Sequence, residues 1–183
     1  WAQTSGDAEL IALMDRAFNL SMITSPQSMT SLGLDTGTYS YMRSRLDQVG
    51  EAAEDMNERL ARRELAALNA ISESSLSETG KVRQGITRFM LEQQLLSDGL
   101  KVPFVGAPYR LSQQDGAYFD IPDFLNSQHP IETREDAEAY LSRLAAFPFV
   151  LDDETAAQAE DAANGVSAPR WSLDLVDGQI SAL

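Results

Sequence analysis

The sequence predicts an all-α protein, on three observations. Apolar residues recur with the helical period through most of the 183 residues, and proline, glycine and serine stand where such helices would begin and end. Strand signals are weak: Pro103 interrupts the apolar run VPFV at 102–105, and the alternating WSLDLV at 171–176 is short enough to belong to a helix. We therefore expect an irregular multi-helix array with a long central loop, forming a single helical domain over residues 1–183.

Three long helices are predicted in the first half of the chain. They span residues 6–24, 51–71 and 78–98, and a short helix begins at Ser25-Pro26 and ends at Gly33. A turn-rich segment, LDTGTYSY, and a serine-rich segment, SESSLS, separate them. The apolar positions are Leu10, Ile11, Leu13, Met14, Ala17, Phe18 and Met22 on the buried face of the first; Met56, Leu60, Ala61, Leu65, Leu68 and Ile71 facing inward on the second; and Val82, Ile86, Phe89, Met90 and Leu96 on one side of the third.

The second half begins with an irregular stretch, residues 112–130, in which a short helix is predicted at 122–128. Thr133 and Asp136 are spaced as a capping box and open a helix that Pro148 should break or kink before it ends at Gly165. A last helix is predicted within 169–183. The expected inner face of the capped helix is Ala137, Tyr140, Leu141 and Leu144.

Composition excludes several classes of function. The 28 acidic and 14 basic residues give a net charge of −14, which repels phosphate backbones and argues against nucleic-acid binding. No apolar run approaches the roughly 18 residues that a transmembrane segment needs. Cysteine is absent, which excludes disulfides and cysteine-ligated metals. The start, Trp1-Ala2-Gln3, resembles the tail of a secretory signal peptide, with Ala2 as the small residue before cleavage, and predicts a periplasmic or secreted protein. Anchoring to the envelope is left open as an alternative.

No catalytic motif is present. A helical zinc hydrolase uses His-Glu-x-x-His, but His129 is the one histidine of the chain, and neither a nucleophile elbow nor a phosphate-binding loop occurs. His129 precedes Pro130, and we expect it to pack against the end of the 122–128 helix rather than to bind metal. The sequence thus predicts no catalytic residue, metal ligand or cofactor in this chain.

Carboxylates are the remaining candidates for chemistry. Asp115, Asp120 and Asp123 surround Tyr118 and Phe119, and such a group can bind a cation or a sugar or act as an acid/base pair. In the alternative interpretation, which we favour, Asp115 makes a turn with the following glycine, Asp120 caps the helix that begins at proline, and the aromatic residues fill the core. That core set is Tyr118, Phe119, Phe124 and Leu125.

Two further groups of charges have two interpretations each. The five acids of residues 151–161 can form a calcium surface or, as we expect, a solvated helix face, because the order of calcium-loop ligands is missing. Arg110 and Arg170 can clamp a carboxylate or satisfy buried helix ends.

Several short motifs, taken in order, resemble the N-terminal part of the bacterial domain-of-unknown-function family 885. They are Ser25-Pro26 followed by Leu32-Gly33, then Gln128-His129-Pro130 before the acidic helix Ala137 to Leu144, and then Gly165-Val166 followed by Pro169-Arg170. Each motif is short and nonspecific, whereas their order and spacing together are distinctive. The resemblance covers most of the chain.

The resemblance implies a longer, exported protein similar to helical zinc metallopeptidases, with the zinc motif in a downstream half. This chain would form one wall of the fold and shape the substrate cleft, and its partners would be that C-terminal half, or a second chain, and a peptide. Tyr118, Asp123 and His129 are the substrate-cleft candidates. The alternatives are a complete noncatalytic α-helical interaction module of the envelope, with an apolar docking face on 169–183, and a helical bundle with a carboxylate-lined pocket for a small molecule.

Overall fold

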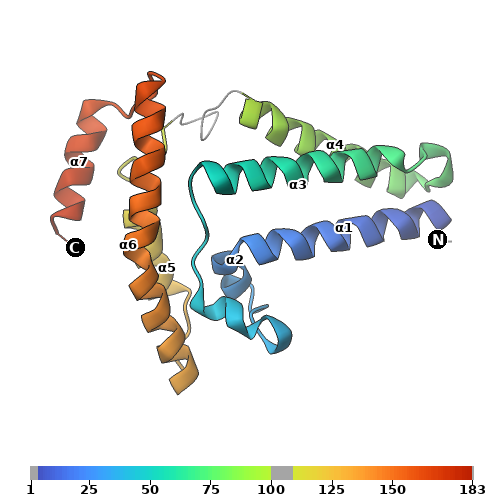
Figure 1. Ribbon diagram of the computed structural model, residues 1–183. Coiled ribbons are helices and arrows are strands. Elements are labelled where there is room, and N and C mark those ends of the chain that lie inside the picture. Colours follow the sequence, from blue (N-terminus) through green and yellow to red (C-terminus); the bar gives the residue numbers. More distant parts are fainter. Residues whose placement is uncertain (1–3, 100–108, 183) are drawn as a thin grey trace. The chain divides into compact units, whose positions relative to one another are not determined.

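The computed structural model describes residues 4–99 and 109–182, and this part of the chain is all-α, as predicted (Figure 1). Instead of strands it contains one isolated bridge, between Ser112 and Asp115. The VPFV segment at 102–105 and the first three residues lie outside the described residues. The α-helices are α1 (Ser5–Thr24), α2 (Pro26–Ser31), α3 (Glu51–Ala70), α4 (Glu78–Gly99), α5 (Ala117–Ser127), α6 (Arg134–Ala163) and α7 (Arg170–Ile180), and the 3₁₀ helices are η1 (Gly37–Ser44) and η2 (Glu73–Ser75).

The described residues divide into two compact units. The first unit contains 4–21 and 52–99, and the second contains 22–51 and 109–182. The expectation that they form a single domain stays a prediction.

Helices α1, α3 and α4 enclose the core of the first unit (Figure 1). Gly6 permits the start of α1 to approach the η2 segment, because a Cβ atom there would lie 2.6 Å from the backbone oxygen of Ser75. Asp7 fixes this approach by accepting a hydrogen bond from the N–H of Ser77 at 3.1 Å. The buried apolar side chains of this core are Leu10, Leu13, Ala61, Leu68, Ile71, Leu76 and Leu91.

The side of α4 that packs on this core is not its more apolar side. Gln84 is 1 % exposed and donates hydrogen bonds to the carbonyl oxygens of Leu68 at 3.0 Å and Ile71 at 2.8 Å, at the end of α3. The apolar side chains predicted to share one side of α4 do share it, but that side is exposed. Phe18 of α1 and Met56 of α3 are also exposed, contrary to prediction.

The core of the second unit lies between α5, α6 and the segment after η1. Helix α6 continues through Pro148, so the helix break considered for this position is wrong. Pro148 and Leu144 are both exposed, and water can therefore bind the Leu144 carbonyl group that loses its helical partner. The buried apolar residues here are Leu46, Ala117, Ile121, Phe124 and Leu125.

The inner face of α6 also differs from prediction. Leu141 and Leu144 are exposed, whereas Asp136, Arg143 and Glu154 are buried together with two small residues, Ala139 and Ala157. These polar side chains are buried because each has hydrogen-bond partners on other segments of the second unit.

The ends of the helices follow their sequence signals. Thr133 and Asp136 form the predicted capping box, with both reciprocal hydrogen bonds present. Gly165 has a φ of +82° and ends α6 in a Schellman motif, in which the N–H of Val166 donates to the oxygen of Asp161 at 2.9 Å. Helix α5 begins at Ala117, five residues before the predicted start, and contains Pro122.

Candidate functional site

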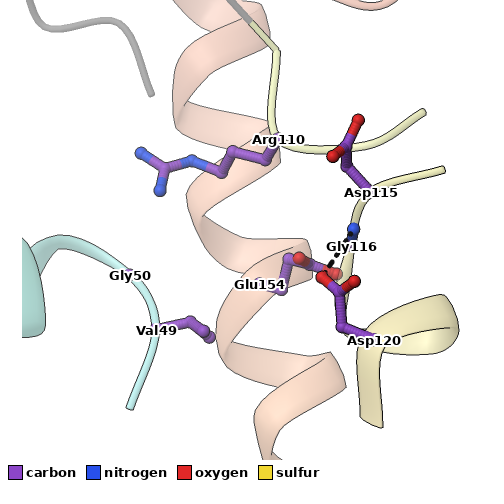
Figure 2. Close-up of a pocket in the computed structure, with 7 residues that line it drawn as sticks. All are labelled: Val49, Gly50, Arg110, Asp115, Gly116, Asp120 and Glu154. Carbon is purple, nitrogen blue, oxygen red and sulfur yellow. Dashed lines mark hydrogen bonds between the residues drawn. The ribbon is translucent and has the colours of Figure 1, made fainter. Parts of the chain in front are cut away.

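An acidic pocket of about 230 Å³ opens in the second unit (Figure 2). Its charged lining residues are Arg110, Asp115, Asp120 and Glu154, and the rest of the lining is Val49, Gly50 and Gly116. Figure 2 shows the three carboxyl groups around the turn at Gly116, with the Arg110 guanidinium extending toward the other side of the view. We call this the acidic pocket.

The turn before α5 positions the carboxyl groups. Gly116 has a φ of +117°, which favours glycine, and a Cβ atom there would lie 2.8 Å from a methyl carbon of Leu111. The N–H of Gly116 donates to Asp120 Oδ2 at 3.3 Å, and the next N–H, of Ala117, donates to both oxygens of Glu154 at 3.0 and 3.1 Å. The acids thus satisfy orphan donors at the start of α5.

The other charged residues of the pocket are engaged as well. Asp115 Oδ2 accepts a hydrogen bond from the hydroxyl of Ser112 at 2.6 Å. Arg110 Nε donates to Asp161 Oδ2 at 2.6 Å, close to the end of α6. Arg110 therefore holds a carboxylate of its own chain, while Arg170 is exposed at the start of α7.

Two carboxyl groups of the pocket have a raised pKa. Burial raises the pKa of Glu154, and the charge of Asp120 adds to this, while the Ala117 N–H and Arg110 oppose it. Burial also raises the pKa of Asp120, aided by Asp115 and Asp123. Such groups exchange protons at higher pH than free carboxyl groups, and when ionised they attract a cation.

The raised pKa of Glu154 should appear in the pH dependence of stability when the Glu154→Gln variant is compared with wild type. The folded-state pKa of Glu154 lies above its unfolded value, so its favourable contribution is full below the unfolded pKa of about 4.3 and is lost as pH rises through the folded pKa. Glutamine keeps an acceptor for Ala117 but does not titrate. We expect the variant to gain stability relative to wild type as pH rises from about 4 to 7, measured by urea unfolding. A difference independent of pH would contradict this.

The structure separates the three cleft candidates. Tyr118 is buried, and its hydroxyl lies 2.8 Å from the oxygen of Ser112 and 2.7 Å from Gln179 Oε1. His129 is buried, whereas Asp123 is exposed on α5. None of these three residues lines the acidic pocket, although Asp123 acts on Asp120 by charge.

His129 belongs to a buried cluster around Arg143, which is 0 % exposed. Arg143 Nη1 donates to His129 Nδ1 at 2.7 Å, so the other ring nitrogen, Nε2, carries the proton and donates to the oxygen of Asp136 at 3.0 Å. The Arg143 guanidinium also lies over the Phe124 ring, 4.8 Å from its centroid. The remaining acceptors of Arg143 are the oxygens of Pro26, Met42 and Arg45 and the hydroxyl of Thr30.

Carboxylates surround this cluster and balance its charge. Burial lowers the pKa of Arg143 to about 10, which leaves it charged at neutral pH. Arg43 binds both Asp35 and Asp136. Hydrogen bonding to Thr133, with further donation from Glu132 and Arg43, lowers the pKa of Asp136 to about 2. The cluster joins α2, η1 and α6, so His129 has the packing role expected from its sequence context.

The sequence indicates Asp115 and Asp120 as candidates for chemistry but predicts a solvated helix face for Glu154. Of the acids in 151–161, Asp152, Asp153 and Glu160 are exposed as expected, whereas Glu154 is buried. Tyr118, Phe124 and Leu125 fill the core as expected, while Phe119 is 40 % exposed.

Neither a metal site nor a membrane span is found among residues 4–99 and 109–182. No group of three or more histidine, cysteine, aspartate or glutamate side chains in this part is arranged to hold a metal ion. No helix in the same ranges is both long and apolar enough to cross a membrane.

Comparison with known protein families matches residues 26–183 to the family described as "Bacterial protein of unknown function (DUF885)". Comparisons with curated proteins and with solved structures gave no match. The family match covers most of the chain and includes the acidic pocket and the Arg143 cluster. This chain belongs to the bacterial DUF885 family.

Proposed function

We propose that this chain is the N-terminal helical part of a secreted or periplasmic zinc-dependent peptidase and that it shapes the substrate cleft. The proposal starts from membership of DUF885. The metallopeptidase part of it rests on the similarity to helical zinc metallopeptidases that the sequence resemblance implies. The described residues do not fit a zinc site, so no catalytic step is assigned to them. In this proposal zinc and the catalytic glutamate belong to a downstream half of the protein.

The acidic pocket is the observation that supports a role in substrate binding. Three carboxyl groups line a cavity of about 230 Å³, which has room for an ammonium group. The net charge of −14 adds a long-range attraction for cations. We therefore assign to the pocket a positively charged group of a peptide, and Asp123 on the adjacent turns of α5 extends the same acidic surface.

Peptide hydrolysis by the full-length protein from its native source tests this assignment. We expect Asp120→Asn to lower kcat/KM for peptides carrying a cationic group by about tenfold, which is the effect of about 1.4 kcal/mol, with zinc content unchanged. Asp123→Asn should act in the same direction but more weakly, because Asp123 is exposed. Asp152→Asn, at an exposed position of α6, is the matched control.

The buried cleft candidates need a conservative test. Alanine at Tyr118 or His129 would remove core packing, so Tyr118→Phe and His129→Asn are to be assayed for turnover and for unfolding in parallel. Unchanged kinetics in these two variants and in both aspartate variants would remove the support for a cleft role.

A noncatalytic interaction module of the envelope is the second candidate function. Exposed apolar side chains on α7 favour it, and they include Trp171 at 59 %, Leu175 at 52 % and Ile180 at 49 %. In this case the native protein would bind neither zinc nor peptide substrates but would capture another envelope component.

A further inference from the structure

Helix α4 presents an exposed apolar stripe opposite the side that packs in the first unit. Each member of the stripe is more than half exposed. The core-facing side of the same helix carries Gln84 and Leu91, which are buried. The α4 stripe consists of Val82, Ile86, Phe89, Met90 and Leu96.

The spacing of the stripe is that of a coiled-coil seam. Val82, Ile86, Phe89, Gln93 and Leu96 follow one another in steps of four, three, four and three residues. This alternation has a period of 3.5 residues, which a straight surface helix does not require. Gln93 is the polar member of the seam, and one polar residue at such a position specifies register.

The two edges of the seam are complementary in charge. Glu78 and Glu92 lie along one edge, at the heptad positions named g, and Arg83 lies along the other, at position e. In a parallel pair of helices each g residue faces an e residue of the partner five positions further on, so Glu78 meets Arg83. In an antiparallel pair the acidic edges would face each other, which is unfavourable.

The same edges are complementary in shape. Gly85 lies on the acidic edge, and a Cβ atom added there would meet nothing within 4 Å. Met90 lies on the opposite edge and is 64 % exposed. The parallel register that pairs Glu78 with Arg83 also places Met90 against Gly85, where the missing side chain leaves room.

We propose that a second copy of this chain covers the α4 stripe, through a parallel coiled coil in register. The inference does not depend on the proposed peptidase function. The seam from Val82 to Leu96 is roughly 21 Å long at 1.5 Å per residue. A seam of this length predicts a reversible dimer that forms with increasing protein concentration.

Analytical ultracentrifugation over a concentration series tests the dimer. We expect Phe89→Ser to weaken dimerisation about 100-fold, because each copy loses a ring from the middle of the seam, where truncating a hot-spot residue costs about tenfold or more. Phe149→Ser removes a comparably exposed ring from α6 and should leave the dimer unchanged. A wild-type protein that stays monomeric at every concentration, or an equal loss in both variants, would overturn the proposal.

Single cysteines distinguish the parallel register from other arrangements, since the chain contains none of its own. Gln93→Cys places a thiol opposite its own copy in the parallel seam, and we expect an added oxidant to convert it to a disulfide-linked dimer. Gln94→Cys, the exposed neighbour outside the seam, should remain monomeric under the same treatment. Cross-linking at neither position, or equally at both, would contradict the register.

The charged edges give an independent check. Arg83→Glu should weaken the dimer about tenfold, and adding Glu78→Lys should restore most of it by reversing the pair. Failure of the double variant to recover would show that Glu78 and Arg83 do not meet across the seam.

Discussion

Replacing Arg143 with methionine is expected to lower the free energy of unfolding of the second unit by about 3–5 kcal/mol. Methionine keeps an unbranched apolar stem but is shorter than arginine and cannot donate a hydrogen bond. It therefore leaves His129 Nδ1, the Thr30 hydroxyl and three backbone oxygens without the guanidinium. It also leaves Asp35 without the charge of Arg143. The loss should appear in urea unfolding and as faster amide hydrogen exchange in α2 and α6.

Arg134 provides the matched control for this change. Its side chain is 86 % exposed and pairs with Glu138 within one turn of the same helix. We expect Arg134→Met to alter stability by no more than about 0.5 kcal/mol. If Arg143→Met and Arg134→Met had equal effects, the cluster would not organise the second unit.

Replacing Gly6 with alanine should destabilise the first unit by about 2 kcal/mol. Alanine gains roughly 1 kcal/mol in a helix interior, but here its Cβ atom would lie 2.6 Å from the oxygen and 2.8 Å from the carbonyl carbon of Ser75, so backbone must move. The hydrogen bond from the Thr4 hydroxyl to the oxygen of Ser75, 2.6 Å long, would be disturbed as well.

Gly85→Ala is the control for backbone propensity, assayed at low protein concentration. Gly85 is also helical, and its added Cβ atom meets nothing within 4 Å. We expect a gain of about 0.5–1 kcal/mol from the lower entropy of the unfolded chain. A gain in stability at Gly6, or equal changes at Gly6 and Gly85, measured by urea unfolding, would contradict the close approach of α1 to Ser75.

The sequence predicts helix ends well because their signals are local. The capping box at Thr133 and the left-handed Gly165 depend on residues a few positions apart, and both occur as predicted. The predicted start of α5 was wrong because it relied on Pro122. The helix begins earlier, at Ala117, where Gly116 is the N-cap and Glu154, from the distant α6, accepts a hydrogen bond from the Ala117 N–H.

The buried faces of α4 and α6 were harder to predict, because buried polar side chains such as Gln84 and Arg143 occupy these faces in place of the periodic apolar residues. Asp136, Arg143 and Glu154 lie 7 and 11 residues apart, close to whole helical turns, so a polar stripe was present in the sequence. Its partners are remote: Arg143 binds the oxygen of Arg45, 98 residues earlier. Periodicity cannot show which distant carbonyl groups converge, and it therefore placed Leu141 and Leu144 inside.

The members of the acidic pocket could be predicted only in part, because long-range packing brings them together. Asp115 and Asp120 are close in sequence and were recognised together, whereas Glu154 joins them only because α6 packs against the start of α5. Tyr118 and His129 are cleft candidates because the family resemblance places residues 112–130 at the cleft. Both are buried, and their hydrogen-bond partners include Gln179 and Arg143, which lie outside that segment.

The most direct test of the proposed function is the zinc content and peptide hydrolysis of the full-length protein purified from its native source. The proposal predicts close to one zinc ion per chain, hydrolysis that a chelator abolishes, and zinc retained when Asp120 and Asp123 are replaced. A zinc-free native protein that cleaves no peptide would contradict the peptidase assignment and leave a helical interaction module.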